Sequence, residues 1–399
     1  MKNLKILMIS SGLDRCGIKD YTNRLLEEMK NYRVNIHQIR ITENDRKNPW
    51  KFILNVLRKI SKEKFDILHF QHEFSMYDKF YGITIIITYL LLKMMSKFKR
   101  FKIVTTLHTI WDLENLKSSI NPKIASSPLY YLAKLYIKYH IKLICMLSNN
   151  VIVLGAPSVK ILEKQYNIDK KKINYISLGV YCINKQSDKI QNIDISYIKE
   201  KFNLINSKVV TLFGFLYPTK GYHYVIEAFP QVIKKNNNVK LVIAGGIPSS
   251  DDSSTYEYYR YLKNLVKSLN LEEHVIFTGY IPDEELFGLF KCTDIFLFPY
   301  ENRVNASAAI NMVLPFKKPI LVSKSPLFNE LVEYNAAIQV DVRNKNKLSE
   351  KILLLLEDDY ICVKLSKNME KYTKENSIKS SALKHIKLYE SLFIGDKKT

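Results

Sequence analysis

Short apolar runs alternate along the chain with segments in which hydrophobic residues recur every three or four positions. The runs predict β-strands, and the longer spacing predicts amphipathic helices. Strands are expected at 4–10, 34–41, 67–70, 103–106, 151–154 and 173–176, and again at 209–213, 239–244, 275–278, 295–298 and 320–322. Such alternation is typical of α/β chains in which helices cover both faces of a parallel sheet.

A polar stretch over 184–196 interrupts this pattern and separates two similar halves. A chain of 399 residues is long enough for two domains of ordinary size. We therefore expect an N-terminal domain over 1–185 and a second domain over 186–375. A last helix within 376–399 is expected to pack back toward the first domain. Two doubly wound sheets in tandem imply a central cleft that the domains face.

The stretch 209–229 joins a predicted strand to a predicted helix through a loop that contains Pro218, Lys220 and Gly221. Such a loop brings backbone N–H groups and one cation to the positive end of a helix, which suits an anion such as a diphosphate. The same residues also fit a structural turn with a solvated lysine. Both interpretations remain open on this loop alone.

Polar residues also follow the predicted strands of the first half. Gly12 and Gly17 bracket the first loop, so a ligand can approach the backbone there, although the Gly-x-Gly-x-x-Gly pattern of dinucleotide sites is absent. His72, Glu73 and His108 stand at two strand ends and could face one crevice, because ligands sit at the carboxyl ends of parallel strands. The alternative for each histidine is a hydrogen-bonded structural role.

The formal net charge of +22, from 61 Lys and Arg against 39 Asp and Glu, favours an anionic partner. An anionic membrane surface, a nucleic acid and an anionic small molecule all fit this charge, as does compositional drift without a function. The sequence contains no helix-turn-helix signature, RNA-recognition aromatic motif or concentrated arginine stripe. We therefore expect no nucleic-acid partner.

Five cysteines, an odd number without metal-ligand spacing, indicate reduced thiols and a cytoplasmic location, with no metal site. Met1 is followed directly by a strand-like segment, so no secretory signal is expected. The longest apolar run, over 83–95, is shorter than the roughly 20 residues that span a bilayer.

Two segments of the first half, 81–102 and 129–147, combine an apolar helical pattern with several lysines. Helices of this kind lie on anionic membrane surfaces, which would place the protein on the inner face of a membrane. The alternative is a pair of core helices with solvated basic ends. The sequence leaves this choice open.

Several short stretches, in a fixed order, identify a family. They are CGIKDYT (16–22), DILHFQHEF (66–74), VTTLHT (104–109), FGFLYPTKG (213–221), LVIAGG (241–246), GYIPDEEL (279–286) and TDIFLFPY (293–300). In these stretches the chain resembles the retaining glycosyltransferases of family 4, also called glycosyl transferases group 1. The resemblance implies the GT-B fold, which consists of two Rossmann-like domains facing a central cleft.

The resemblance also implies an activity and a set of site residues. Members transfer a sugar from a nucleoside-diphosphate sugar to an acceptor without a divalent metal, and the nucleotide-sugar is a substrate, so no cofactor is expected. By resemblance, His108 contacts the transferred sugar and Gly17 lies near the donor phosphates. Lys220 neutralises the diphosphate, on which negative charge grows as the glycosidic bond breaks. His72 and Glu73 fall in the acceptor-binding domain.

The chain departs from the family pattern in its donor site. Where the family has a second loop cation, this chain has Phe215 and its neighbours, so Phe215 is assigned to the donor site in that altered place. The paired glutamates of the family fall at Val304 and Met312, and the glycine after them at Lys317. The donor site is therefore either rebuilt from other residues or lost.

Nearby polar residues are candidates for the rebuilt donor site. Arg303 would supply the second cation, Asn305 a polar contact and Asn311 a hydrogen bond to the ribose. The amides of Ser307 and Ala308 would cap a phosphate at a helix start. Glu330 falls where the family keeps a glutamate near the donor, and it is equally explained as a helix N-terminal charge.

Two functions therefore stand side by side. The first is a cytoplasmic hexosyltransferase that acts at the membrane surface, on a glycan or lipid-linked acceptor, in polysaccharide biosynthesis. The second is a degenerate GT-B protein that binds a glycan or protein partner without catalysis. The motifs fit a uridine or guanosine diphosphate donor and do not choose between them.

Overall fold

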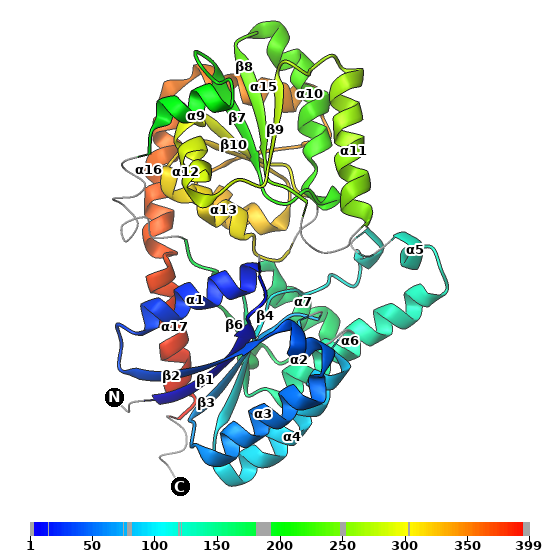
Figure 1. Ribbon diagram of the computed structural model, residues 1–399, viewed down its shortest axis with the longest axis vertical. Helices are drawn as coiled ribbons and strands as arrows, with labels where there is room; N and C mark the ends of the chain where they lie inside the picture. Colours follow the sequence, from blue (N-terminus) through cyan, green and yellow to red (C-terminus); the bar gives the residue numbers. More distant parts are fainter. Residues whose placement is uncertain are drawn as a thin grey trace. The chain divides into compact units, whose positions relative to one another are not determined.

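The structure is a computed structural model that describes residues 4–14, 16–74, 76–77, 82–118, 120, 122–180, 193–247, 253–301 and 304–393 (Figure 1). The chain divides into two compact units. Unit 1 consists of Met1–Gly179, Val304–Ala306 and Ile378–Thr399, and unit 2 of Val180–Arg303 and Ser307–Ser377. The contact division thus falls at 179/180, and it assigns the last helix to unit 1.

Unit 1 is built on a six-stranded parallel sheet with the order β2-β1-β3-β4-β5-β6. The strands are β1 (Leu4–Ser11), β2 (Val34–Ile41), β3 (Ile67–His72), β4 (Lys102–Leu107), β5 (Asn150–Val153) and β6 (Ile173–Tyr175). Every residue of β3 is buried, as expected for a parallel strand that helices cover on both faces.

Helices pack on both faces of this sheet (Figure 1). On one face, α1 (Gly17–Met29) packs beside α17 (Ile378–Ser391). The other face carries α3 (Pro49–Lys62), α4 (Ile83–Lys99), α6 (Leu129–Leu147) and α7 (Pro157–Tyr166), each in contact with the next. The remaining short elements are α2 (Glu43–Lys47), η1 (Leu116–Ser118), α5 (Pro122–Ala125) and η2 (Lys170–Lys172).

Unit 2 has a second six-stranded parallel sheet with the order β12-β11-β10-β7-β8-β9. The strands are β7 (Lys208–Phe213), β8 (Val239–Ala244), β9 (Val275–Gly279), β10 (Ile295–Phe298), β11 (Ile320–Ser323) and β12 (Ile338–Val340). The helices are α9 (Ile195–Lys201), α10 (Tyr222–Lys235), α11 (Ser253–Ser268), α12 (Asp283–Cys292), α13 (Ala308–Val313), α14 (Asn329–Glu333), α15 (Lys345–Glu357) and α16 (Asp359–Glu375). The 3₁₀ turns among the described residues of this unit are η4 (Pro218–Lys220), η5 (Leu314–Phe316) and η6 (Pro326–Phe328).

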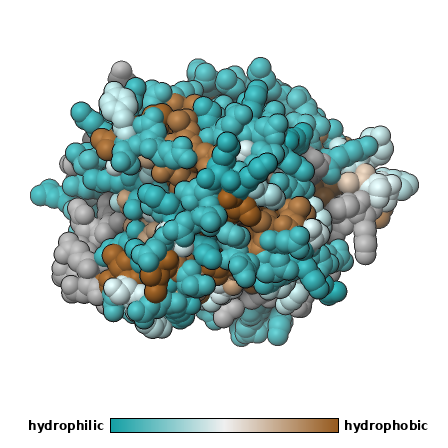
Figure 2. All heavy atoms as spheres, turned by 90° about the horizontal axis from the view of Figure 1, so that it is seen from above, coloured by the Kyte–Doolittle hydropathy of each residue, from teal (hydrophilic) through white to brown (hydrophobic). Residues whose placement is uncertain are grey.

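The hydrophobic cores follow from these layers. In unit 2, one apolar cluster joins β7 and β8 to α10, α11 and α15, and another joins the same sheet to α12 and α16. The face drawn in Figure 2 is mostly hydrophilic, with hydrophobic patches between polar side chains. The predicted α/β class with two doubly wound parallel sheets is therefore confirmed.

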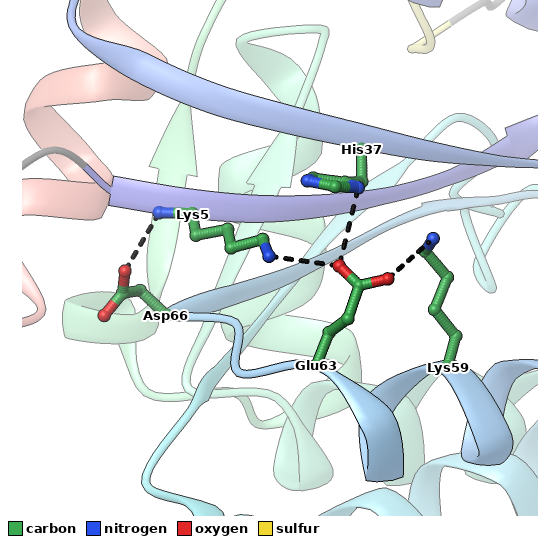
Figure 3. Close-up of polar contacts among 5 residues, drawn as sticks. All are labelled: Lys5, His37, Lys59, Glu63 and Asp66. Carbon is green, nitrogen blue, oxygen red and sulfur yellow. Dashed lines mark hydrogen bonds and ion pairs between the residues drawn. The ribbon is translucent and has the colours of Figure 1, made fainter.

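A charged cluster lies near the amino ends of the unit 1 strands (Figure 3). The Glu63 carboxylate accepts hydrogen bonds from Lys5 Nζ at 3.0 Å and Lys59 Nζ at 3.3 Å, and it lies 3.7 Å from His37 Nδ1. The hydrogen bonds from the two lysines lower the pKa of Glu63. The Asp66 carboxylate accepts the backbone N–H of Lys5 at 2.9 Å. The cluster therefore joins the end of α3 to the side of the sheet where the strands begin. This side lies opposite the carboxyl ends of the strands.

None of the helices in the described part of the chain has both the length and the apolar character needed to cross a bilayer.

Candidate functional site

The strand order of each sheet reverses direction once, next to its first strand. The reversal lies between β1 and β3 in unit 1 and between β7 and β10 in unit 2. Open parallel sheets bind ligands at the carboxyl ends of the two strands that flank such a point. The predicted site residues are therefore considered at each of these places in turn.

His108 directly follows β4 in unit 1 and contacts the end of β3. Its Nε2 lies 2.8 Å from Gln71 Oε1, and its backbone N–H donates to the His72 carbonyl at 3.0 Å. The Tyr21 ring meets the imidazole edge-on, with the ring centroids 5.6 Å apart. Burial lowers the pKa of His108 to about 3, so the imidazole is neutral at pH 7. A neutral imidazole at a strand end can exchange hydrogen bonds with sugar hydroxyls without attracting a counter-charge.

Glu73 joins the loops that follow β3 and β4. Its carboxylate accepts hydrogen bonds from the Thr109 hydroxyl and from the Phe74 backbone N–H at 3.0 Å. Burial raises the pKa of Glu73. Glu73 therefore lies on the same edge of the sheet as His108, and its carboxylate is hydrogen-bonded to neighbouring residues of the protein.

His72 points into the core of unit 1. Its ring stacks on Tyr77 and on His140, with centroids 5.8 and 5.3 Å away. Within the described residues, neither ring nitrogen of His72 has a hydrogen-bond partner. Burial lowers its pKa well below the usual value. The His72 ring is therefore held by ring packing and not by the hydrogen bonds of the structural alternative, while its backbone carbonyl accepts the His108 N–H.

A buried polar network that the sequence did not predict lies in unit 1 beneath His108. The two ring nitrogens of His69 lie 2.5 Å from the Tyr389 hydroxyl and 2.8 Å from the Thr106 hydroxyl. His385 stacks on His69 with the centroids 5.8 Å apart. Burial lowers the pKa of His69 well below the usual value and that of His385 to about 4. The network fixes α17 to β3 through neutral side chains.

Gly17 begins α1, beside the strand reversal of unit 1. A Cβ added at Gly17 would meet no atom within 4 Å, so packing against the described residues does not require a glycine there. The N-cap residue, Cys16, makes no side-chain hydrogen bond to the helix. The space beside Gly17 is therefore compatible with the predicted approach of a donor phosphate.

Lys220 lies at the strand reversal of unit 2, between the ends of β7 and β10. Only 7% of Lys220 is exposed, and its Nζ donates to the Tyr300 hydroxyl at 2.5 Å. The Tyr300 hydroxyl in turn lies 3.2 Å from Ser307 Oγ. A desolvated ammonium interacts with an anion more strongly than a solvated one does. Lys220 is therefore buried, which contradicts the alternative of a structural turn with a solvated lysine.

Two glycines allow the loop to bring Lys220 inward. Gly214 has φ +127° and Gly221 has φ +68°, values that L-residues rarely adopt. A Cβ at Gly221 would lie 2.1 Å from the Pro299 carbonyl oxygen, and one at Gly214 would lie 3.7 Å from Lys220 Nζ. The glycines therefore serve the close approach of this loop to the end of β10.

The other predicted donor residues are divided among several places. Ser307 caps α13 and Ala308 begins it, while Asn311 lies within this helix and is partly exposed. Phe215 is partly exposed in the Lys220 loop, with its ring 6.5 Å from that of Tyr217. Lys220, Ser307 and Ala308 are thus brought together through Tyr300.

Two predicted donor residues make other contacts. The Asn305 side-chain amide accepts from the Ile110 backbone N–H at 2.8 Å and donates to the Ile110 carbonyl at 3.0 Å, both within unit 1. The Glu330 carboxylate accepts from the Tyr372 hydroxyl at 3.4 Å. Arg303 lies outside the described residues.

Tyr300 and Gln71 are the site residues that sequence reasoning missed. Both stand within two residues of a strand end, Gln71 in DILHFQHEF and Tyr300 in TDIFLFPY. The strand-end rule that selected the histidines would also have selected these two. The partners of Tyr300 lie on other elements, and the sequence alone did not reveal them.

In the part of the chain that the structure describes, no group of three or more His, Cys, Asp or Glu side chains is arranged to hold a metal ion.

Two family models match this chain over adjacent ranges. Residues 195–376 match glycosyl transferases group 1, and residues 20–182 match glycosyltransferase family 4. The chain belongs to this family of glycosyltransferases. The matched ranges correspond to the second and first α/β halves, so the resemblance stated from the motifs is confirmed.

Curated relatives match over shorter ranges. Mannosylfructose-phosphate synthase of Agrobacterium fabrum is 25% identical over 240 residues, which cover 60% of this chain and 52% of the relative. A GDP-mannose-dependent alpha-(1-6)-phosphatidylinositol monomannoside mannosyltransferase of Mycolicibacterium smegmatis is 31% identical over 106 residues, which cover 27% of this chain and 25% of the relative. The chain thus spans about half, or less, of the length of these relatives.

Solved structures match over nearly the whole chain. Anabaena HepE in complex with UDP has a TM-score of 0.71 and 17% identity, and the match covers 97% of this chain and 100% of HepE. Sucrose-phosphate synthase of Thermosynechococcus elongatus has a TM-score of 0.73 and 16% identity, covering 98% and 100%. At this level of identity the likeness establishes the fold, and the GT-B expectation is confirmed.

Proposed function

We propose that this member of the family is an active, retaining glycosyltransferase that uses a nucleoside-diphosphate sugar. The observation that carries the proposal is the buried Lys220 ammonium at the strand reversal of unit 2. In the reaction, the bond between the anomeric carbon and the diphosphate oxygen breaks, a bond to the acceptor oxygen forms, and the acceptor hydroxyl proton passes to the departing diphosphate. The diphosphate gains negative charge as it leaves, and a fixed cation in a desolvated place stabilises that charge.

Unit 1 supplies a complementary, neutral environment in this proposal. His108 has a depressed pKa and a hydrogen bond to Gln71, so it offers a neutral, oriented imidazole to a sugar hydroxyl. The reaction needs no metal if Lys220 and backbone N–H groups carry the charge of the leaving group. We propose no cofactor and no nucleic-acid partner.

The donor and acceptor classes come from the relatives. HepE was crystallised with UDP, and the mannosyltransferase relative is named for GDP-mannose and a phosphatidylinositol mannoside. We accordingly propose a UDP- or GDP-hexose donor. The proposed acceptor is a glycan or a lipid-linked saccharide at the cytosolic surface of a membrane, in polysaccharide or glycolipid synthesis.

One observation favours the second function, a GT-B protein that binds without catalysis. The Asn305 side chain, a candidate replacement in the donor site, is hydrogen-bonded to the Ile110 backbone through both its oxygen and its nitrogen. Phe215 occupies the place of the family's second cation. A donor site without that cation would bind nucleotide weakly and would stabilise the departing diphosphate poorly.

Calorimetric titration with UDP and GDP separates the two functions. The proposal expects micromolar binding of one nucleotide, and a loss of about 1–3 kcal/mol in Lys220→Ala, as for a charge-assisted hydrogen bond. Lys234→Ala is the matched control, because Lys234 is exposed on α10, the helix that follows the loop. If neither nucleotide binds the unaltered protein, the donor site is inactive and the second function is favoured.

A further inference from the structure

The outer layer of unit 1 carries an unusual surface. The helices α3, α4 and α6 lie side by side on one face of the sheet (Figure 1). Together they contain ten Lys or Arg residues and no Asp or Glu. Each of them also exposes large hydrophobic side chains. We call the outward surface of these three helices the apolar-basic face.

On α6, the exposed hydrophobic residues form a stripe. Leu132, Leu135, Tyr139 and Met146 are each about half exposed or more, and their spacing places them on one side of the helix. The opposite side is buried against the sheet and the neighbouring helices. Three lysines of α6, Lys134, Lys138 and Lys142, are partly exposed and follow one flank of the helix at a spacing of four residues.

The neighbouring helices expose further hydrophobic side chains. On α4, Met94 is 64% exposed and Phe98 is 86% exposed, next to the basic end of the helix. On α3, Trp50 and Leu54 are each 59% exposed. Burial and the nearby positive charges of Lys172, Lys102 and Lys97 lower the pKa of Lys93, which places several like charges around this part of α4.

The two alternatives left open by the sequence can now be compared. Core helices with solvated basic ends would bury their long hydrophobic side chains, whereas α4 and α6 bury one side and expose hydrophobic residues on the other. Scattered exposed hydrophobic residues are ordinary, but a contiguous patch marks an interaction surface. Lysines beside it select a partner that is apolar and negatively charged.

We propose that the apolar-basic face docks unit 1 onto an anionic phospholipid surface, with α4 and α6 lying in the plane of the interface. Apolar side chains enter the boundary of the acyl chains while the lysines contact lipid phosphates. Trp50 is suited to the same boundary, since its ring is apolar and its indole N–H is polar. This docking deepens the proposed function, because it brings the enzyme to a lipid-linked acceptor.

Sedimentation with vesicles tests the docking without measuring activity. The full chain is mixed with phosphatidylcholine vesicles or with mixed phosphatidylcholine–phosphatidylglycerol vesicles, at low and high salt. Binding is expected only with phosphatidylglycerol and is expected to weaken in high salt. Replacing Lys134, Lys138 and Lys142 by Gln should lower the partition coefficient about a hundredfold, at about 1 kcal/mol per charge.

Matched variants in unit 2 control for charge and hydrophobicity. Replacing Lys364, Lys367 and Lys371 by Gln changes the net charge equally on an exposed side of α16, and it should leave binding unchanged. Met94→Ser with Phe98→Ser should lower binding at least tenfold. Tyr360→Ser with Val363→Ser removes two equally exposed side chains from α16 and should not.

Three results would overturn the docking. They are equal binding to both vesicle types, equal losses in the α6 and α16 lysine variants, and a dimer in sedimentation equilibrium that Phe98→Ser dissociates. The last would assign the face to a second copy of the chain. UDP and GDP titration of the same variants reports on the proposed function separately, so failure of one does not imply failure of the other.

A separate observation concerns Tyr300 in unit 2. It is 1% exposed, and its ring packs against Phe298 and Phe328 with centroids 5.6 and 5.4 Å away. Its hydroxyl accepts a hydrogen bond from Lys220 Nζ at 2.5 Å. A lysine side chain has four torsions, so a rigid partner determines where its ammonium lies.

We infer that Tyr300 is a positioning residue for Lys220 and thereby for the donor diphosphate. This inference rests on the proposed function. The Tyr300 hydroxyl receives one ammonium hydrogen and so directs the ammonium at the end of β7. Packing of the Tyr300 ring then keeps the Lys220 ammonium in place when a nucleotide binds.

Calorimetry with UDP, or with GDP if GDP is the ligand, and with the parent nucleoside tests this role. Tyr300→Phe should lower affinity for the diphosphate about tenfold, the value of one hydrogen bond, and leave nucleoside affinity unchanged. In a Lys220→Met background the same substitution should have no further effect. Equal losses in both backgrounds, or an equal loss for the nucleoside, would assign Tyr300 a merely structural role. If the unaltered protein binds neither nucleotide, the proposed function fails first and this inference falls with it.

Discussion

The two sheets present opposite chemistry at the same topological place. In unit 1 the strand ends carry histidines, hydroxyls and an amide, and burial depresses the pKa values of His69, His72 and His108. In unit 2 the corresponding place holds the Lys220 ammonium against Tyr300. One scaffold thus carries neutral polar side chains at one strand reversal and a buried cation at the other. The difference arises from a few strand-end residues.

The largest expected effect is a difference in acid stability. His69, His72 and His385 are fully buried and their pKa values are lowered, so the folded state holds fewer protons than the unfolded state below about pH 6.5. Stability is therefore retained above this pH and lost as the pH falls toward the folded pKa values. For each unit by which the pH falls in this range, the three histidines together lower the unfolding free energy by up to about 4 kcal/mol.

Hydrogen exchange at pH 7.5 and 5.5 measures this difference by segment. Peptides from β3 and α17 should lose protection at pH 5.5, after correction for intrinsic rates, while peptides from β7 and α10 retain it. His72→Phe keeps the aromatic stack and removes a titrating group, so it should recover about a third of the loss. Equal acid lability of the two units would refute the contrast.

The next effect concerns two loop glycines, one in each unit. Gly221→Ala places a Cβ 2.1 Å from a backbone oxygen at φ +68°, and we expect it to cost about 2–4 kcal/mol of unfolding free energy. Gly17→Ala meets no atom within 4 Å and should change stability by less than about 0.5 kcal/mol. Urea denaturation measures both values.

Nucleotide titration extends this pair of variants. If donor phosphates approach Gly17, the alanine variant should keep its stability and lose UDP or GDP affinity. A Gly17→Ala protein with unchanged affinity would place the phosphates elsewhere. A stable Gly221→Ala protein would contradict the close approach of the Lys220 loop to Pro299.

The contrast between the units also indicates what the sequence alone could reveal. The alternation of strands and helices specified the two sheets, because each strand has its own apolar run and each helix its own period. The strand-end rule located His108 and Lys220. Both inferences use information within about ten neighbouring residues.

Other features depend on distant parts of the chain. The core placement of His72 comes from stacking on Tyr77 and His140, and His69 is held by Tyr389, 320 residues away in sequence. Asn305 looks polar and available in the sequence, yet its amide is hydrogen-bonded to the backbone of Ile110. Side-chain direction in such cases follows from tertiary packing, which local spacing does not encode.

The smallest effect tests the network that supports the neutral edge. Tyr389→Phe removes the hydroxyl beside His69 Nδ1 and leaves a buried nitrogen without this partner. We expect a loss of about 1–3 kcal/mol in unfolding free energy from urea denaturation. Tyr334→Phe is the control, since its hydroxyl bonds Glu375 at an exposed site and the loss should be smaller. Because neither Tyr389 nor His69 is among the predicted donor residues, nucleotide affinity should not change. A variant that lost UDP or GDP affinity in proportion to stability would mean that α17 supports the donor site as well, and the separation of a neutral from a cationic edge would be incomplete.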